Sequence, residues 1–414
     1  MKFLFSGITI RVTKKVIESN FVVALLANSK MESAAYSQSA AAAVHSSFRE
    51  VFDQYSWDEV SERIYSKTEA DVIGALENAG NASINDFMAL VSPVALKYVE
   101  EMAQRSHRIT RKRFGNVIQM YIPLYLSNEC QNICTYCGFS FDNRIERLTL
   151  NEDQALREVE AIKAMGYDHI LLVTGEANRT VGVDYLEKMV KLIRPQFSGI
   201  MIEVQPLEQH EYERLIEAGV SSVLVYQETY HEENYRIYHT KGKKSNFHYR
   251  LDTPDRIGRA GAHRIGLGAL LGLEDWRVDS FFTALHLDYL EKTYWKTKYS
   301  ISFPRLRPAV GCQQPNHPMS DKELVQLICA WRIFNENLEL SLSTRESQQF
   351  RNHAVKLGIT SISAGSKTNP GEYANHFHAL EQFEVSDGRS PREVADMISS
   401  HGYEPVWKDW DKVF

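Results

Sequence analysis

Most of the chain alternates between strand-like apolar runs and segments with helical spacing. From residue 117 onward, eight runs rich in Val, Ile, Leu and Tyr are mostly separated by segments whose apolar residues recur every three or four positions. The runs span 117–126, 169–174, 199–205, 222–227, 264–271, 299–306, 339–343 and 359–364. The helical segments include 152–165, 208–218, 254–261, 278–293 and 321–334. This alternation without hairpin turns predicts an α/β fold, a (β/α)8 TIM-type barrel, with a doubly wound open sheet as the main alternative.

Helical patterns also flank the predicted barrel. Residues 48–113 show helical spacing, and the stretch 90–113 is expected to be one helix with Pro93 near its start. Beyond residue 365 the chain is rich in turn residues and then helical over 391–401. We therefore expect an N-terminal helical layer over 46–115, the barrel over 116–366 and a short C-terminal extension over 367–414.

The first 45 residues differ from the rest of the chain. They contain few acids and no Pro, and they end in an Ala/Ser tract, which predicts an unstructured or loosely helical extension. An apolar run over 21–27 follows a basic start, so a secretory signal is a weak alternative. Met31 is an alternative start of the protein. No stretch approaches the ~18 apolar residues of a membrane span, so no membrane association is expected.

Composition narrows the class of protein. Hydrophobic residues make up 43% and charged residues 24% of the 414 residues, which are ordinary globular values. The net charge of −6 argues against a partner with a phosphate backbone, so nucleic acid is not expected. Five cysteines are too few for a disulfide scaffold and their number is odd. Three of them lie within eight residues, which points to a shared function.

These three cysteines, Cys130, Cys134 and Cys137, follow the first predicted strand with the spacing C-x3-C-x2-C. Thiolates on one short loop favour zinc or an iron–sulfur cluster. A structural zinc site is normally closed by a fourth Cys or His. The other two cysteines, Cys312 and Cys329, lie far along the chain. Three protein ligands would leave one iron of a cube-shaped cluster open to a small molecule, whereas incidental buried cysteines are the structural alternative.

Polar residues collect where the second and third strands are expected to end, which is where barrel enzymes carry their active sites. Thr174, Gly175 and Glu176 end the second strand, and this carboxylate would suit a ligand's ammonium group or else lie on the surface. Glu203 and Gln205 are expected to point together into the barrel from the third strand, where a ribose hydroxyl pair would satisfy the buried carboxylate.

Three other strand ends carry further candidates. Gly268 and Gly272 in the fifth run permit close approach of a ligand to the backbone, or are simply strand glycines. Arg305 and Arg307 leave the sixth run beside prolines. Either could bind a substrate carboxylate in a bidentate manner, with a salt bridge across barrel loops as the alternative. Tyr125, at the end of the first run, could meet the substrate's amino group or simply pack.

The cysteine spacing, with aromatic Tyr136 before the last cysteine, resembles the signature of the radical S-adenosylmethionine superfamily. The resemblance implies a [4Fe-4S] cluster whose open iron binds S-adenosylmethionine, and cleavage of that cofactor to a 5′-deoxyadenosyl radical. It also implies an external reductant, such as an NADPH-linked flavodoxin or ferredoxin system. In that superfamily a turn like 174–176 holds the methionine amino group, and a strand like 264–271 contacts the adenine.

Six segments extend the resemblance to one branch of that superfamily, the 2-iminoacetate synthase family of tyrosine lyases in thiamine biosynthesis. They are 123–128, 225–231, 253–261, 303–308, 342–346 and the ending 406–411. The resemblance implies that a hydrogen is taken from the amino group of L-tyrosine, that the Cα–Cβ bond breaks, and that 2-iminoacetate and p-cresol form. It implies thiazole synthase as protein partner, a separate electron-donor protein, and a substrate carboxylate near Tyr125 and the two arginines. A cluster of this kind requires a reducing compartment, so a cytoplasmic location is expected.

Three other functions are considered. The tyrosine lyase of hydrogenase maturation carries a second cluster on C-terminal cysteines, whereas this chain has no cysteine after Cys329. The deazaflavin-forming tyrosine enzyme lacks the terminal Trp-Lys-Asp-Trp run. A non-catalytic protein with structural zinc belongs to a different class, and it would be colourless and unable to cleave S-adenosylmethionine.

Overall fold

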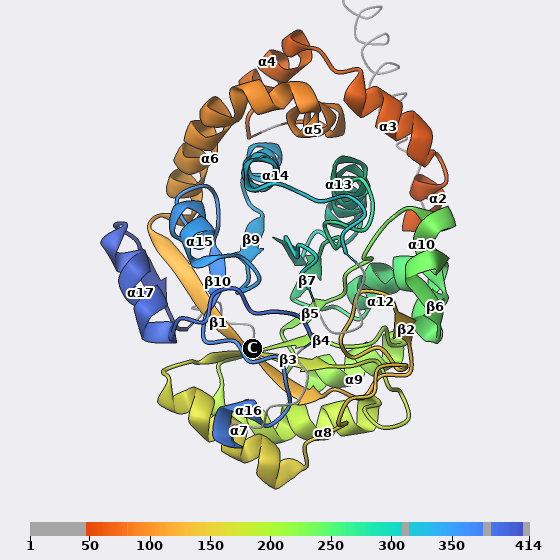
Figure 1. Ribbon diagram of the computed structural model, residues 1–414, viewed down its shortest axis with the longest axis vertical. Coiled ribbons are helices and arrows are strands. Elements are labelled where there is room, and N and C mark those ends of the chain that lie inside the picture. Colours follow the sequence, from red (N-terminus) through yellow and green to blue (C-terminus); the bar gives the residue numbers. More distant parts are fainter. Residues whose placement is uncertain (1–46, 81, 309–313, 376–381, 409–414) are drawn as a thin grey trace, which may run out of the picture. The chain divides into compact units, whose positions relative to one another are not determined.

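A computed structural model describes residues 47–80, 82–308, 314–375 and 382–408. Among these residues, eight parallel strands close into a barrel (Figure 1). They are β1 (Val117–Ser127), β3 (His169–Thr174), β4 (Gly199–Glu203), β5 (Ser222–Leu224), β7 (Arg264–Leu267), β8 (Lys298–Ser302), β9 (Glu339–Leu342) and β10 (Ser361–Ser363). Each strand pairs with the next, and β10 pairs back to β1 at Gln119–Tyr121. The TIM-type prediction is confirmed, and the open sheet is excluded by this closing pair.

Each of the eight predicted apolar runs contains a strand, but several strands end earlier than their run. The strand β4 ends at Glu203 and β7 ends at Leu267. Beyond these ends only isolated bridges continue the pairing, between Glu228 and Ala269 and between Leu271 and Arg305. The last residues of these runs therefore belong to the loops at the carboxyl end of the barrel, where side chains no longer alternate between lumen and exterior.

Helices cover the outside of the barrel and follow the predicted segments closely. The larger ones are α7 (Glu152–Ala164), α8 (Val183–Ile193), α9 (Gln209–Ala218), α12 (Thr253–Arg259), α13 (Trp276–Thr293), α14 (Asp321–Phe334) and α15 (Gln348–Ala354). Capping boxes at Asn151 and Ser320 begin α7 and α14. Gly166, with φ of +97°, follows the end of α7 as expected for a C-terminal glycine.

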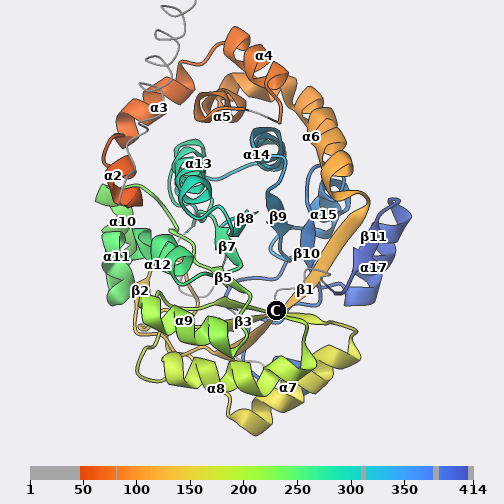
Figure 2. The same cartoon turned by 180° about the vertical axis from the view of Figure 1, so that it is seen from behind.

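An N-terminal layer of helices arches over α13 and α14 (Figures 1 and 2). It consists of α2 (Phe48–Phe52), α3 (Trp57–Tyr65), α4 (Glu69–Glu77), α5 (Ile84–Val91), the 3-10 helix η1 (Pro93–Tyr98) and α6 (Val99–Phe114). The prediction of a single helix over 90–113 is wrong. Ser92 is extended, with ψ of 158°, because a residue before proline is disfavoured in the helical region, so α5 ends there.

Several short elements carry no clear periodic signal and were not predicted. β2 (Ile133–Cys134), in the cysteine loop, pairs antiparallel with β6 (His239–Lys241), which follows α10 (Glu232–Tyr238). α11 (Phe247–Leu251) precedes α12. Near the C-terminus, α16 (Glu372–Asn375) and β11 (Glu404–Val406), which pairs with the start of β1, were also not predicted. Between them, α17 (Pro391–Ser400) confirms the helix predicted over 391–401.

Two further predictions concern the N-terminal extension and membrane association. The expected N-terminal extension over 1–45, with Met31, lies outside the described residues. Of the helices that the structure describes, none combines the length and apolar character needed to cross a membrane.

Candidate active site

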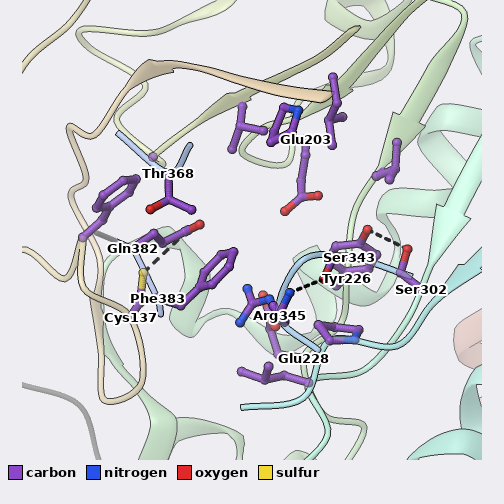
Figure 3. A pocket seen from close by; sticks show the side chains of 18 of the residues that line it. Cys137, Glu203, Tyr226, Glu228, Ser302, Ser343, Arg345, Thr368, Gln382 and Phe383 are labelled. Atoms are coloured by element: carbon purple, nitrogen blue, oxygen red, sulfur yellow. Dashed lines mark hydrogen bonds between the residues drawn. The ribbon is translucent and has the colours of Figure 1, made fainter. Parts of the chain in front are cut away.

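A cavity opens at the carboxyl ends of the barrel strands, and the three clustered cysteines form part of its wall. Its other lining residues include the ends of β1, β3, β4, β8, β9 and β10, the loop after β5, Lys244, Arg250 and the segment that follows α16. Figure 3 shows Glu203 and Arg345 reaching into this cavity, with Cys137, Gln382 and Phe383 on one side. The C-terminal extension therefore contributes to the site, which its sequence did not indicate.

The cysteine loop is held by one arginine side chain. The Arg147 guanidinium donates hydrogen bonds to the backbone carbonyls of Asn128, Phe139, Ser140 and Asn143, at 2.7, 2.9, 2.7 and 3.3 Å. These carbonyls come from both ends of the loop, so this one side chain fixes its span. A charged donor that bonds four carbonyls of one segment gives the loop a defined shape.

Gly175 packs directly against this loop. Its backbone N–H donates to the carbonyl of Ser127 at 2.9 Å, and a Cβ at this position would lie 2.2 Å from the carbonyl oxygen of Glu129. No side chain fits in that space. The neighbouring Thr174 lines the cavity, and its Oγ1 is buried without a partner among the described residues. The predicted turn 174–176 therefore does lie beside the cysteines.

The three thiols lie in an apolar setting that suits a bound cluster better than free thiolates. Burial raises the pKa of Cys130 to about 11 and also raises the pKa values of Cys134 and Cys137. Metal binding deprotonates such thiols outright. In the described residues, no three His, Cys, Asp or Glu side chains are arranged to bind a single metal ion. The cysteines of a [4Fe-4S] cluster each bind a different iron, so three thiols along one wall fit that group.

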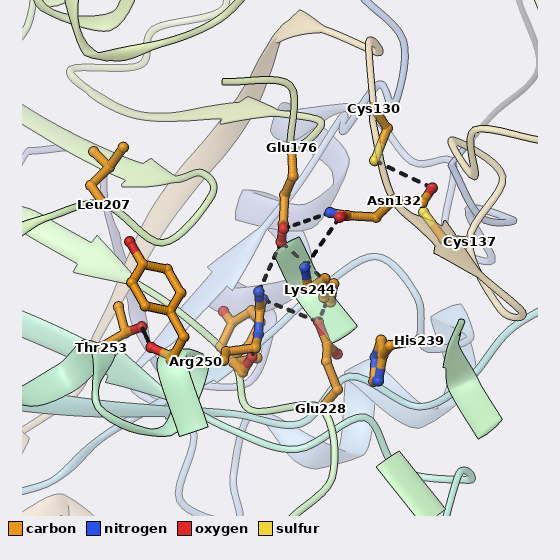
Figure 4. A network of polar contacts seen from close by, with 12 residues as sticks. Cys130, Asn132, Cys137, Glu176, Leu207, Glu228, His239, Lys244, Arg250 and Thr253 are labelled. Atoms are coloured by element: carbon orange, nitrogen blue, oxygen red, sulfur yellow. Dashed lines mark hydrogen bonds and ion pairs between the residues drawn. The ribbon is translucent and has the colours of Figure 1, made fainter. Parts of the chain in front are cut away.

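Four buried charged residues form a cluster next to the cysteine loop (Figure 4). We call Glu176, Glu228, Lys244 and Arg250 the charge cluster. Arg250 Nη1 lies 2.9 Å from Glu176 Oε1, and Lys244 Nζ lies 2.7 Å from Glu228 Oε1 and 3.7 Å from Glu176 Oε1. Asn132, within the cysteine loop, donates from Nδ2 to Glu176 Oε2 at 2.8 Å.

The charge cluster favours the ionised forms of Glu176, Lys244 and Arg250. Burial alone would raise the pKa of Glu176, but Arg250 and Lys244 hold it below its ordinary value. Burial alone would lower the pKa values of the two cations, but their carboxylate partners raise both. Glu228 has φ of +73°, the only positive φ of a non-glycine residue in the described chain. A strained residue of this kind is typical of a functional site.

Most of this cluster was not predicted from the sequence. Glu228 lies in the polar stretch after the fourth strand that marks a strand end, but Lys244 and Arg250 lie in an irregular segment with no motif. The run of three lysines within 241–244 is the one signal that could have drawn attention there. The pairing of β2 with β6 and a hydrogen bond from the Lys244 backbone N–H to Asn132 Oδ1 bring this segment to the cysteines.

Further into the cavity, Glu203 and Arg345 are the charged side chains outside the charge cluster. Burial raises the pKa of Glu203 to about 7, although the charge of Arg345 opposes this shift. Burial lowers the pKa of Arg345. Its guanidinium lies 3.4 Å from the centre of the Phe383 ring and makes no hydrogen bond or ion pair with any described residue. Its unsatisfied donors are therefore available to a ligand in the cavity.

Tyr125 lines the cavity as expected. Its hydroxyl donates to Gln382 Oε1 at 2.7 Å, and its ring meets Phe139 edge to face. The pKa of Tyr125 is raised by burial and by the nearby Glu203 carboxylate, so the phenol remains protonated. This contact joins β1 to the C-terminal segment directly above the cavity.

The two arginines predicted to bind a carboxylate do not line the cavity. Arg305 Nε donates to Glu346 Oε1 at 2.9 Å, and its guanidinium also pairs with Asp321 at 2.8 Å. Arg307 Nη2 lies 2.8 Å from Glu346 Oε2, and the Glu346 side chain is almost fully buried. Both arginines neutralise this carboxylate, so the geometry supports the salt-bridge alternative. Arg345, three residues after the seventh strand, lines the cavity where Arg305 and Arg307 were expected.

Three predicted cofactor residues also lie outside the cavity wall. Gln205 comes after the end of β4, where the alternation of the strand has stopped, and its Nε2 donates to the carbonyl of Val181 at 2.7 Å. Gly268 leaves no room for a side chain because a Cβ would lie 2.9 Å from the carbonyl of Ser302. Gly272 adopts φ of +121° in a turn. These two glycines serve chain packing and a turn, and neither touches the cavity.

Comparison with known proteins agrees with this site. Residues 124–284 match the model of the radical SAM superfamily, and residues 302–404 match the Biotin and Thiamin Synthesis associated domain. The chain is 53% identical to the 2-iminoacetate synthase of Salmonella typhimurium and 52% identical to that of Escherichia coli. Each match covers 88% of this chain and 97% of the relative.

Solved structures show the same fold. A crystal structure of HydG, a maturase of the [FeFe]-hydrogenase, is 30% identical with a TM-score of 0.81, covering 85% of this chain and 79% of HydG. HydG of Carboxydothermus hydrogenoformans is also 30% identical, with a TM-score of 0.76 and coverage of 87% and 83%. The identity to the 2-iminoacetate synthases is much higher and extends over nearly their whole length. The chain therefore belongs to the 2-iminoacetate synthase family of radical SAM enzymes.

Proposed function

We propose that the cavity of this lyase is where L-tyrosine is split at its Cα–Cβ bond into 2-iminoacetate and p-cresol, the reaction that supplies the thiazole part of thiamine. One observation carries the proposal: three cysteines and an arginine without an ion-pair partner among the described residues face the same cavity. The cysteines suit a [4Fe-4S] cluster and the arginine suits the carboxylate of an amino acid.

At the outer end, Cys130, Cys134 and Cys137 would bind three irons of the cluster and leave the fourth for S-adenosylmethionine. When bound, these groups supply a carbon-centred radical that removes a hydrogen atom. Thr174 offers a buried hydroxyl without a partner in the described chain, and Glu176 lies beside it, so both suit the polar part of the cofactor. The charge cluster fixes this end of the site by tying Asn132 of the cysteine loop to the barrel.

At the inner end, Arg345 would bind the carboxylate of L-tyrosine through two parallel hydrogen bonds. Glu203, when ionised, would accept hydrogen bonds from the amino group. Tyr125 closes the site above them through Gln382. These contacts would hold the nitrogen of the substrate toward the cysteine end, where its hydrogen is to be removed.

The test is anaerobic reconstitution of the full chain with iron and sulfide, followed by addition of dithionite, S-adenosylmethionine and L-tyrosine. We expect 5′-deoxyadenosine and p-cresol from the native protein and neither from Cys130→Ala, Cys134→Ala or Cys137→Ala. Cys329→Ala is the matched control, because this buried thiol lies on α14 away from the cavity and should leave both products unchanged. Continued formation of 5′-deoxyadenosine by a reconstituted Cys134→Ala protein would contradict the cluster assignment.

Two protein partners follow from the chemistry. Each turnover that consumes S-adenosylmethionine needs an electron, so an electron-donor protein of an NADPH-linked flavodoxin or ferredoxin system is proposed. The imine product is unstable in water, so a thiazole synthase that consumes it is the second proposed partner. A coupled assay should yield glyoxylate and ammonia from hydrolysed imine when the thiazole synthase is omitted. Less glyoxylate should form when the thiazole synthase is present together with its sulfur donor and its other carbon substrate.

A further inference from the structure

The inner part of the cavity ends on hydroxyl groups. Tyr226 donates from its hydroxyl to Ser302 Oγ at 3.1 Å, and Ser341 Oγ donates to the Tyr121 hydroxyl at 3.0 Å (Figure 3 shows the first pair). Tyr121, Ser302 and Ser341 also line a second, smaller cavity deeper in the barrel, so they separate the two spaces. We call Tyr121, Tyr226, Ser302 and Ser341 the hydroxyl floor.

A floor of this composition is unusual for the inside of a barrel. Barrel interiors of this fold are dominated by layers of Val, Ile and Leu. Here Leu171, Val173 and Leu224 form an apolar wall, and Leu171 and Leu224 extend along it into the second cavity. The hydroxyl floor adds polar groups at the level where the two cavities meet. An apolar sleeve that ends on hydroxyls matches a ligand that is apolar along its length and carries one polar atom at its tip.

The depth of the floor fits the proposed position of the substrate. Along β1, the residues Tyr121, Pro123 and Tyr125 all line the cavity, as expected for alternate positions of a strand. Four strand residues span about 13 Å, so Tyr121 lies well below the level of Tyr125. An L-tyrosine with its carboxylate at Arg345 would extend its ring down the sleeve and bring the phenol oxygen toward the floor.

Each hydroxyl pair leaves one hydrogen free for a ligand. A hydroxyl has one donor hydrogen, so Ser302, which accepts from Tyr226, keeps its own hydrogen, and Tyr121, which accepts from Ser341, keeps its hydrogen as well. Burial raises the pKa values of Tyr121 and Tyr226, although their serine partners oppose the shift, so both phenols remain protonated. Two donors on different strands, β1 and β8, can therefore be directed at one oxygen atom.

We propose that the hydroxyl floor binds the phenol oxygen of L-tyrosine through the hydroxyls of Ser302 and Tyr121, and that it excludes phenylalanine. The inference rests on the proposed tyrosine reaction and names the part of the site that recognises the phenol. Phenylalanine would leave these two buried donors without an acceptor, and a site built to bond a hydroxyl rejects the analogue that lacks it far more strongly than a purely apolar pocket would.

The test measures amino acid binding to the cluster-reconstituted full chain with S-adenosylmethionine and without reductant, so that no turnover takes place. Equilibrium dialysis with labelled L-tyrosine and L-phenylalanine gives the ratio of their dissociation constants. We expect a preference for tyrosine on the order of 10⁴-fold in the native protein. Ser302→Ala and Tyr121→Phe, tested separately, should each reduce that ratio by about tenfold or more.

Ser300→Ala is the matched control. Ser300 lies on the same strand two residues deeper and lines only the second cavity, so its variant should keep the native ratio. Circular dichroism establishes that each variant is folded, and the two floor variants lie on different strands, so one remains informative if the other fails to fold.

Two outcomes separate the floor from the function it serves. A native ratio in both Ser302→Ala and Tyr121→Phe, with p-cresol still formed by the native enzyme, would overturn the hydroxyl floor alone. A native protein that binds neither amino acid and forms no p-cresol would overturn the tyrosine assignment, and the floor with it.

Discussion

At the scale of single residues, Arg345 is the most informative side chain in the cavity. A buried guanidinium is costly unless its charge has a partner, yet the Arg345 guanidinium lies over the face of the Phe383 ring and has no ion-pair partner among the described residues. Arg307 has the same chemistry but is ion-paired with Glu346. The difference between the two lies in their surroundings and cannot be read from their positions in the sequence.

We expect Arg345→Lys to raise the KM for L-tyrosine by about tenfold or more, because lysine cannot form the two parallel hydrogen bonds of a guanidinium with a carboxylate. The KM for S-adenosylmethionine should stay within about twofold, since the proposed cofactor site is at the other end of the cavity. Steady-state assays of p-cresol provide both constants. Arg307→Lys is the control, and an equal rise in both variants would mean that the carboxylate is bound elsewhere.

Glu203 should make tyrosine binding depend on pH. Its pKa of about 7 is above that of a free carboxyl because of burial, with Glu228 adding to the shift and Arg345, Lys244 and Arg250 opposing it. Below pH 7 the group is mostly neutral and attracts the ammonium weakly. The dissociation constant of tyrosine should therefore fall as pH rises from 6 to 8.

The Glu203→Gln variant should bind tyrosine more weakly at pH 8 and with little change over this range. The stability of the folded protein changes with pH in the opposite direction. Because the pKa of Glu203 is higher in the folded than in the unfolded protein, its ionisation destabilises the native protein as pH rises from about 4.5 to 7. Urea unfolding of the native and Gln forms at pH 5 and pH 8 measures this. A native-like pH profile of binding in the Gln variant would exclude Glu203 as the titrating group.

At the scale of elements, the turn after β3 and the cysteine loop are fitted to each other through Gly175. Gly175→Ala would place a methyl group 2.2 Å from the Glu129 carbonyl, so the loop must move. We expect iron content after reconstitution to fall by half or more, with loss of the absorbance of the cluster. Iron analysis and visible spectra of the purified protein check this.

A glycine-to-alanine substitution should be stabilising where the added Cβ meets no neighbouring atom. Gly74 lies in the exposed helix α4, where a Cβ would meet nothing within 4 Å, so Gly74→Ala should stabilise the protein by about 0.5–1 kcal/mol and leave iron content unchanged. If Gly175→Ala loads as much iron as Gly74→Ala, the close packing against the loop has no bearing on cluster binding.

The elements that could be predicted from the sequence are those with a long periodic signal. The apolar runs gave all eight barrel strands, and α14 has the predicted bounds. The β2–β6 pair and β11 were not predicted because two or three residues carry no periodicity. For the same reason the cysteines, which have a spacing motif, were identified as a group, whereas Lys244 and Arg250 reach the site through tertiary contacts such as the β2–β6 pairing, which no motif marks.

At the scale of the whole molecule, the C-terminal extension forms part of the cavity wall. Gln382 and Phe383 line the cavity, and Asp387 anchors this segment to the barrel. The Asp387 side chain is 1% exposed and pairs with Arg351, which is fully buried, and with Arg389 at 2.6 Å. The composition of this segment does not indicate that it folds back to the mouth of the barrel.

Asp387→Asn should destabilise the protein by about 3–5 kcal/mol, because it leaves Arg351 buried without a counter-charge. Burial would raise the pKa of Asp387, but Arg389 and Arg351 hold it below its ordinary value. The stabilisation is therefore complete above about pH 4 and is lost as pH falls through the folded pKa. Thermal unfolding at pH 7 and at pH 3 should show a large difference between native and variant only at pH 7. Asp396→Asn, on the exposed face of α17, should match the native protein at both values.

The contact between Gln382 and the cysteine loop bears on how the metal centre is assembled in the cell. The backbone N–H of Gly138 donates to the Gln382 carbonyl at 3.1 Å, so the loop acquires this cover only from a part of the chain synthesised more than 240 residues later. A ribosome adds residues from the N-terminus, so the three thiols leave the exit tunnel long before their cover exists. During that interval a scaffold that delivers iron and sulfide can reach the thiols without passing Gln382.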